Sequence, residues 1–314
     1  MSRRSTMLSL VQEYLAFRRD LGFKLGTAGN ELLLFGRYAD RSGHRGPLTI
    51  ELAVRWAKLP VEAKPEYWAW RLHAVRMFAK HRAVEDPRTE VPPPGLLGRT
   101  YRRAQPHIYS AEELASLLEA ASKLRRRMRP HTCVALFGLL AATGMRVGEA
   151  LRLGREHVDL DAGVIEVVKS KSGKSRLVPL HGSTVEALHR YVLERERVHP
   201  VPKSTAFFLT DRGTALTYQR VTVTFRELRR QLNWRGAPGR EPPRVQDLRH
   251  TFAVRALLRW YRAGADVDAK ITALATYLGH VNVTCTYRYL TAIPELMAFT
   301  GRRFERYAAQ GGGR

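Results

Sequence analysis

Three consecutive prolines at positions 92–94 constrain the fold of this chain more than any other feature. Proline has a fixed φ angle and no backbone N–H, so the run Val91-Pro-Pro-Pro-Gly95 fits neither a helix nor the interior of a sheet. We expect a stiff, extended connector here, rich in arginine on its C-terminal side. A chain of 314 residues is long enough for two domains with separate cores. The prolines therefore predict domains over residues 1–86 and 108–314, joined by a basic linker over 87–107.

Apolar residues recur at helical spacing throughout the first domain. Val11, Tyr14 and Leu15 mark a first helix, which Gly22 ends. The last helix begins at Pro65, since proline fits a first helical turn. The spacing predicts four helices in all, the first ending near residue 22 and the others covering about 27–42, 49–60 and 65–86.

The charge of the chain indicates a polyanionic partner. It has 53 Lys and Arg against 29 Asp and Glu, a formal net charge of +24 and a pI near 10.8. Nucleic acid is the usual partner of such a surplus, and an anionic membrane is the alternative. Because the chain has no lipidation motif, signal peptide or long apolar run, we expect a cytoplasmic protein that binds double-stranded DNA and no membrane. The basic residues expected to contact DNA are Arg71, Arg76, Lys80, Arg99, Arg102, Arg103, Lys174 and Arg244.

The basic face of the last helix in the first domain has two interpretations. Arg71, Arg76 and Lys80 are predicted on the side opposite the apolar stripe. Such a face is either solvated or in contact with phosphates.

The two cysteines, Cys133 and Cys285, lie far apart in apolar or helical contexts and predict reduced packing residues. No acidic metal cluster is apparent in the sequence, so we expect neither a metal nor a cofactor.

Patterns in the second domain predict helices around a small sheet. A capping box, Ser110-Ala-Glu-Glu113, opens the first helix, and an apolar run predicts a buried helix after it. The β-branched runs on either side of Lys171-Ser-Gly-Lys174 predict an antiparallel hairpin. A second capping box begins at Ser183. The remaining elements are expected at 132–142, 183–198, 207–209 (a short strand) and 221–232.

A glycine turn precedes an arginine and a glutamate in the middle of the chain. Residues 143–153 read Thr-Gly-Met-Arg-Val-Gly-Glu-Ala-Leu-Arg-Leu. Gly144 permits a sharp turn, Arg146 stands at a helix start, and Glu149 one turn later can hold its guanidinium group. Alone, this pattern predicts only a helix junction with an ion pair.

The stretch from Arg244 to Tyr289 combines three groups suited to phosphodiester chemistry. It reads Gln246-Asp-Leu-Arg249-His-Thr-Phe-Ala, then Leu-Gly-His280, with Tyr289 nine residues later. An arginine can bind an oxyanion, an imidazole can donate a hydrogen bond, and a phenol can act as nucleophile. Each has an ordinary alternative: a surface charge, a helix cap and a half-buried aromatic. Their order and spacing favour the chemical interpretation.

These boxes resemble the phage integrase family, the tyrosine recombinases, over residues 108–292. The family pattern is Ala-Thr-Gly-x-Arg-x-x-Glu-x-Leu-x-Leu, then His-x-x-Arg, Leu-Gly-His and a nucleophilic tyrosine at this distance. The resemblance implies a mainly α fold, with an N-terminal four-helix SAM-like core-binding domain and a mostly helical catalytic domain with a small antiparallel sheet. The chain departs from the pattern at Gln246, where the family usually has histidine.

The resemblance also implies a reaction. A tyrosine attacks the scissile phosphate to form a 3′-phosphotyrosyl link, two arginines bind the phosphate and a carboxylate supports them. A lysine protonates the leaving 5′-oxygen and a histidine donates a hydrogen bond. Lys171 is preferred to Lys169 and Lys174 from its place in the hairpin turn. The implied catalytic residues are Tyr289, Arg146, Lys171, Arg249, His280, Gln246 and Glu149.

Such enzymes act as tetramers on two DNA sites, in integrative elements and transposons, some with accessory recombinases, and need neither ATP nor a metal. Two alternatives stay open. One is a catalytically weakened DNA-binding partner of another recombinase, which Gln246 favours. The other is a strand-swivelling enzyme of the type IB topoisomerase kind, which shares much of the catalytic set. The compact N-terminal helical domain favours the recombinase.

Overall fold

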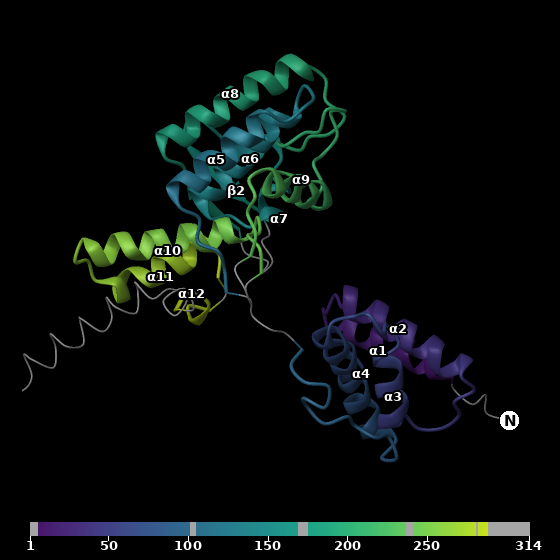
Figure 1. Cartoon of the computed structure of the whole chain (residues 1–314). Coiled ribbons are helices and arrows are strands. Elements are labelled where there is room, and N and C mark those ends of the chain that lie inside the picture. Colours follow the sequence, from purple (N-terminus) through teal and green to yellow (C-terminus); the bar gives the residue numbers. More distant parts are fainter. Residues whose placement is uncertain (1–5, 101–104, 169–174, 237–240, 281, 288–314) are drawn as a thin grey trace, which may run out of the picture. The chain divides into compact units, whose positions relative to one another are not determined.

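The computed structural model describes residues 6–100, 105–168, 175–236, 241–280 and 282–287. The chain divides into two compact units, Met1–Arg103 and Ala104–Arg314 (Figure 1). The described residues are mostly helical, and a three-stranded antiparallel sheet lies in the second unit. The predicted fold class, mainly α with a small antiparallel sheet, is confirmed.

The first unit is a bundle of four helices whose starts follow from local sequence. Thr6 and Thr49 cap two of them, each accepting a hydrogen bond from the backbone N–H three residues later. Pro65 occupies the first turn of the last one. The helices are α1 (Met7–Asp20), α2 (Gly26–Arg41), α3 (Ile50–Ala57) and α4 (Pro65–Glu85), which confirms the four that were predicted.

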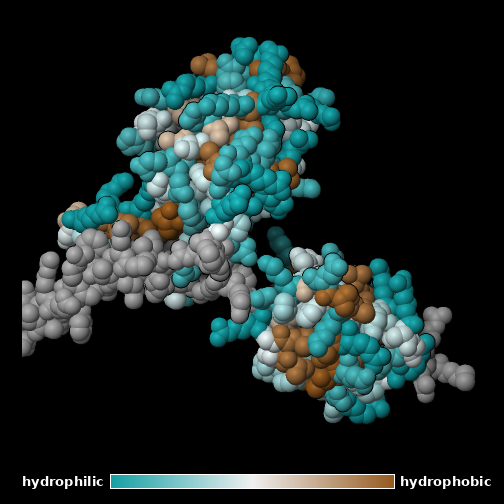
Figure 2. All heavy atoms as spheres, viewed as in Figure 1, coloured by the Kyte–Doolittle hydropathy of each residue, from teal (hydrophilic) through white to brown (hydrophobic). Residues whose placement is uncertain are grey.

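Large aromatic side chains fill the core of this unit. Trp56 and Phe35 are buried and meet edge to face, with ring centroids 5.3 Å apart. Gly36 lets α2 approach α1 closely, since a Cβ there would lie 2.8 Å from the Cα of Leu8. Figure 2 shows apolar side chains gathered on the visible face of this unit as well, whereas hydrophilic residues dominate that of the second unit.

The sequence predicted that Arg71 belongs to an exposed basic face. The structure shows that it does not. The residue is only 5% exposed. Its guanidinium group stacks on the ring of Trp56 at 3.8 Å, donates to Glu31 Oε2 at 3.1 Å and donates to the carbonyl of Ala57 at 3.2 Å. Because its partners come from α2 and α3, Arg71 joins helices inside the first unit and cannot contact a phosphate.

The proline segment also packs more closely than expected. Glu90 N–H donates to the carbonyl of Leu48, and Arg76 Nε donates to that of Pro92, each at 2.9 Å. Val91 and Leu97 lie against the core of the first unit. The sequence predicted an extended connector rather than a packed element, and this part of residues 87–107 packs against the first unit instead.

The second unit arranges helices around α6, which packs against its neighbours α5, α8 and α10. Figure 1 shows α10 and α11 side by side. The capping box of Ser110 and Glu113 is present. The elements are α5 (Ala111–Ser122), α6 (Arg129–Thr143), α7 (Val147–Ala150), η1 (Arg155–His157), β1 (Val158–Asp159), β2 (Val164–Val167), β3 (Arg176–Pro179), α8 (Gly182–Val198), α9 (Tyr218–Gln231), α10 (Asp247–Arg262), α11 (Val267–Leu278) and α12 (Thr284–Tyr287).

The sheet contains the predicted hairpin and one strand that was not predicted. β2 pairs antiparallel with β3, Ile165 opposite Val178, and also with the short β1. The capping box proposed at Ser183 is wrong, because α8 begins one residue earlier and the side chain of His181 accepts from the N–H of Ser183. Residues 207–209 form no strand; Leu209 makes one isolated bridge, to Ala215, and the carbonyl of Phe207 accepts from the side chains of Tyr191 and Arg195 in α8.

No helix among the described residues is both long and apolar enough to cross a membrane.

Candidate active site

A tight turn between α6 and α7 places Arg146 and Glu149. Gly144 ends α6 in the left-handed region at φ 62°, and a Cβ there would lie 2.6 Å from the Phe252 ring, so both backbone and space require glycine. Arg146 follows at the N-terminus of α7. Glu149 Oε1 accepts from Arg146 Nη1 at 2.7 Å, and Oε2 accepts from the Arg146 backbone N–H at 3.1 Å. The predicted support of Arg146 by Glu149 is present.

Arg249, in the first turn of α10, connects this turn to the end of α11. The residue is 9% exposed. Its Nη1 donates to the carbonyl of Gly144 and its Nη2 to that of Leu278, both at 2.8 Å. Arg146 Nη2 donates to the next carbonyl, that of Gly279, at 3.3 Å. Arg146 and Arg249 are 103 residues apart in sequence. They thus hold adjacent peptides of one turn.

His280 is the residue after that turn and lies beside both arginines. Gly279 ends α11 at φ 68°, and the His280 N–H closes the cap on the carbonyl of Ala275 at 2.9 Å. The ring Nδ1 lies 2.7 Å from the hydroxyl of the buried Thr286. Burial lowers the pKa of His280 to about 4, and the charges of the neighbouring arginines add to the effect. The imidazole is therefore neutral at pH 7.

Arg176 is the member of the site that the sequence did not reveal. It opens β3, and its side chain is 10% exposed. Its Nη2 donates to Glu149 Oε2 and its Nε to the carbonyl of Tyr277, each at 2.8 Å. The only available signal was a charged residue at the start of an apolar strand.

Glu149 remains ionised at the centre of these contacts. Burial alone would raise its pKa, but the hydrogen bond and charge of Arg176, followed by those of Arg146, outweigh burial and lower it. We define the arginine cluster as Arg146, Glu149, Arg176, Arg249 and His280. With His280 neutral, three guanidinium groups face one carboxylate, which leaves a positive site suited to a phosphate.

Gln246 lies at the N-terminus of α10, is exposed, and donates from Nε2 to the Tyr218 hydroxyl at 2.6 Å. Nearby, Arg244 Nη2 donates to Asp247 Oδ1 at 2.9 Å. Gln246 therefore stands one helical turn before Arg249, with its amide directed to α9.

Comparison with known proteins decides the family. The model of the phage integrase family matches residues 108–295, which include the whole arginine cluster. The chain belongs to the phage integrase family. This family is that of the tyrosine recombinases, and its model spans more than half of the chain.

Relatives match nearly the whole chain. A candidate integrase/recombinase of Sinorhizobium fredii, y4rB, is 43% identical over 96% of this chain and 98% of its own length. The tyrosine recombinase XerC of Erythrobacter litoralis is 29% identical over 89% of this chain and 86% of its own length. Among solved structures, the Tn1549 transposon integrase in complex with transposon right end DNA has a TM-score of 0.70 at 16% identity, covering 97% of this chain and 100% of that one. That likeness establishes the fold.

Several residues predicted from the resemblance to tyrosine recombinases lie outside the described residues. These include the predicted nucleophile and general acid; they are Tyr289, Lys171, Lys174, Arg102 and Arg103. Of the other predicted DNA contacts, Lys80 and Arg99 are exposed, whereas Arg76 and Arg244 are half-buried and hydrogen-bonded.

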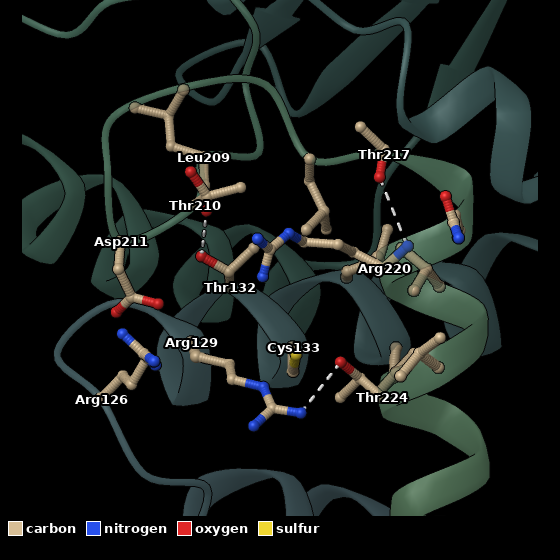
Figure 3. A pocket seen from close by; sticks show the side chains of 16 residues that line it. Arg126, Arg129, Thr132, Cys133, Leu209, Thr210, Asp211, Thr217, Arg220 and Thr224 are labelled. Atoms are coloured by element: carbon tan, nitrogen blue, oxygen red, sulfur yellow. Dashed lines mark hydrogen bonds between the residues drawn. The ribbon is translucent and has the colours of Figure 1, made fainter.

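A hollow of about 510 Å³ between α6 and α9 shares no residue with the arginine cluster (Figure 3). Thr132 donates to the carbonyl of Leu209 at one wall, and Arg129 donates to Thr224 at another. Burial raises the pKa of the Cys133 thiol here to about 12, so this cysteine is a packing residue. In the part of the chain that is described, no three His, Cys, Asp or Glu side chains gather as metal ligands would.

Proposed function

We propose that this tyrosine-type site-specific DNA recombinase cleaves and rejoins strands through a 3′-phosphotyrosyl intermediate on Tyr289. The observation that carries the proposal is the arginine cluster itself. Four separate segments meet at one turn and together form a positive, largely buried site. They are residues 144–149, 176, 249 and 277–280. A charge-rich pentavalent phosphorane-like transition state needs donors that are already in place.

Each described residue of the site has a role that its contacts support. Arg146 and Arg249 bind the non-bridging phosphate oxygens, because planar guanidinium forks match phosphate geometry. Glu149 supports Arg146 through two hydrogen bonds, one from the guanidinium group and one from the backbone N–H. His280, neutral at pH 7 with Nδ1 engaged by Thr286, presents its other ring nitrogen to the phosphate.

The remaining steps fall to residues outside the described ranges. The Tyr289 oxygen attacks the phosphorus and the bond to the 5′-oxygen breaks. Lys171 transfers a proton to that 5′-oxygen, which leaves as a hydroxyl group. Religation reverses each step with another strand's 5′-hydroxyl as nucleophile. Since the phosphotyrosyl bond retains the energy of the phosphodiester, no ATP and no metal are required.

The setting of this reaction forms part of the proposal. Residues 1–86 serve as the core-binding domain, 87–107 as a basic linker and 108–314 as the catalytic domain, and together they grip duplex DNA. We expect a homotetramer on two recombination sites, with or without an accessory recombinase, in the cytoplasm. The likeness to the S. fredii integrase/recombinase supports a role in an integrative or transposable element.

A catalytically weakened DNA-binding partner remains the second candidate. The observation that favours it is Gln246, whose amide cannot transfer a proton as histidine can. In that case the protein would occupy a recombination site and leave cleavage to another subunit.

The test is covalent capture of DNA. Purified protein is incubated with nicked duplex fragments from the DNA that flanks its gene, and denatured products are sequenced. A recombinase should yield adducts whose released strand carries a 5′-hydroxyl that polynucleotide kinase labels without phosphatase. Adducts at scattered positions, with relaxation of plasmids and no exchange, would indicate a topoisomerase. Sequence-specific binding without any adduct would indicate the weakened partner.

A further inference from the structure

Arg176 connects three parts of the arginine cluster through one side chain. Its Nη2 donates to Glu149, which holds Arg146, and its Nε donates to the carbonyl of Tyr277, just before the turn that carries His280. These contacts span 27 and 101 residues of sequence. Few side chains other than arginine can make both bonds, because the donors lie at fixed positions on one plane.

The third nitrogen of Arg176 is packed against a glycine. Nη1 is buried and, among the described residues, has no hydrogen-bond partner. A Cβ on Gly279 would lie 2.7 Å from this atom and 3.0 Å from the guanidinium carbon. Gly279 is therefore required twice, for its positive φ and for the space that Arg176 fills. The guanidinium group thus lies against Gly279, the residue that immediately precedes His280.

We propose that Arg176 is a positioning residue, which fixes Glu149 and the turn of residues 277–280 relative to each other so that Arg146 and His280 face one phosphate. This inference rests on the proposed function. The leaving-group lysine assigned above, Lys171, lies between β2 and β3 in the sequence, and Arg176 ties β3 to the phosphate site.

Loss of Arg176 has two separable effects. Without it, Glu149 keeps only Arg146, and the turn loses the bond at Tyr277. A displacement of about 1 Å in such a site can reduce the rate about a hundredfold. The charge of Arg176 also contributes to the low pKa of His280, together with Arg249 and Arg146, while Glu149 acts in the opposite direction. The ring of His280 thus reports on Arg176 without any reaction.

The experiment compares Arg176→Lys and Arg176→Gln with Arg195→Gln in the full-length protein. Arg195 is a matched control, because it is 4% exposed and donates to the carbonyls of Ala206 and Phe207, outside the cluster. We expect both Arg176 variants to form the covalent adduct about a hundredfold more slowly, with DNA affinity within about threefold of wild type. Lysine should not rescue, since it cannot make both bonds.

The second readout is the titration of His280 in free protein, followed by NMR of its ring. Arg176→Gln should raise its pKa, whereas Arg195→Gln should leave it near 4. An unchanged His280 pKa, or wild-type cleavage by Arg176→Gln at a temperature where it is folded, overturns the proposal. If wild type itself forms no adduct, the proposed function fails, and the NMR titration still tests whether the charge of Arg176 acts on His280.

Discussion

Gln246 Nε2 donates to the Tyr218 hydroxyl at 2.6 Å and so joins the start of α10 to the start of α9. The hydroxyl accepts this hydrogen bond, which leaves its own proton to be donated elsewhere. Gln246, the one position that departs from the family pattern, therefore shares a hydrogen bond with Tyr218, a second residue that can donate to a phosphate.

We expect Gln246→Ala to slow single-turnover cleavage by about a hundredfold, as loss of an oxyanion donor does. Gln246→His should be tolerated or modestly faster, because imidazole can both donate and transfer a proton. Tyr218→Phe should cost about tenfold or less, the value of one neutral hydrogen bond. Cleavage of one nicked substrate by the four proteins provides the measurement. If the alanine variant cleaves at the wild-type rate, Gln246 is a bystander; if only the histidine variant cleaves, the chain is a weakened partner.

The nucleophile can be assigned with two tyrosines of the same segment. Tyr289→Phe should bind DNA with wild-type affinity and form no covalent adduct, since only the attacking oxygen is lost. Tyr287→Phe is the matched control; Tyr287 ends α12, is 41% exposed and should not be required for the adduct. Denaturing gels of a suicide substrate distinguish the two. The reverse result would move the nucleophile to Tyr287.

The stability of the catalytic unit should decrease as the pH is lowered through a window set by His280. Its pKa is about 4 in the folded protein and about 6.5 in an unfolded chain. Below pH 6.5 the unfolded state takes up a proton that the folded state refuses, so stability decreases between pH 6.5 and 4. His280→Asn removes this titration and keeps a polar partner for Thr286. Urea unfolding at several pH values should show a flatter profile for the variant; parallel profiles would contradict the low pKa.

Salt dependence separates Lys80 from Arg71, two of the three basic residues of α4 that the sequence grouped together. Lys80 is exposed, and if it contacts a phosphate, Lys80→Gln should reduce the slope of log affinity against log salt by about one. Arg71→Gln should instead destabilise the first unit, because it removes one partner of Glu31 and the stack on Trp56. Binding titrations and thermal unfolding measure both effects. An unchanged slope for Lys80→Gln would place this residue away from DNA.

Much of the fold was predictable because its signals are local. The caps at Thr49 and Ser110 and the left-handed glycine before Arg146 follow from a few adjacent residues. The ion pair of Arg146 and Glu149 spans a single helical turn, so the spacing alone predicted it.

Arg71 was misplaced and Arg176 was missed for the opposite reason. Arg71 was placed on the surface by counting apolar neighbours, yet its partner Glu31 is 40 residues away. Arg176 bonds to a carbonyl 101 residues away, and nothing in a β-strand pattern indicates such a partner. The sequence predicted Ser183 as the cap of α8, but His181 is the cap. Two nearby polar residues could each have capped this helix, and the sequence alone did not distinguish them. Nonlocal polar contacts leave no periodic trace in a sequence.

The long sequence separations within the arginine cluster have a consequence during synthesis of the protein. Arg146 reaches Gly279 across 133 residues, and Arg249 reaches Gly144 across 105. A nascent chain that has emerged only as far as α9 has Glu149 and Arg146 but lacks the turn that completes the phosphate grip. Such late, long-range closure is slow compared with local helix formation. A ribosome-bound or truncated fragment that ends before α10 therefore lacks Arg249 and His280, and the arginine cluster is complete only when the whole second unit has been synthesised and has folded.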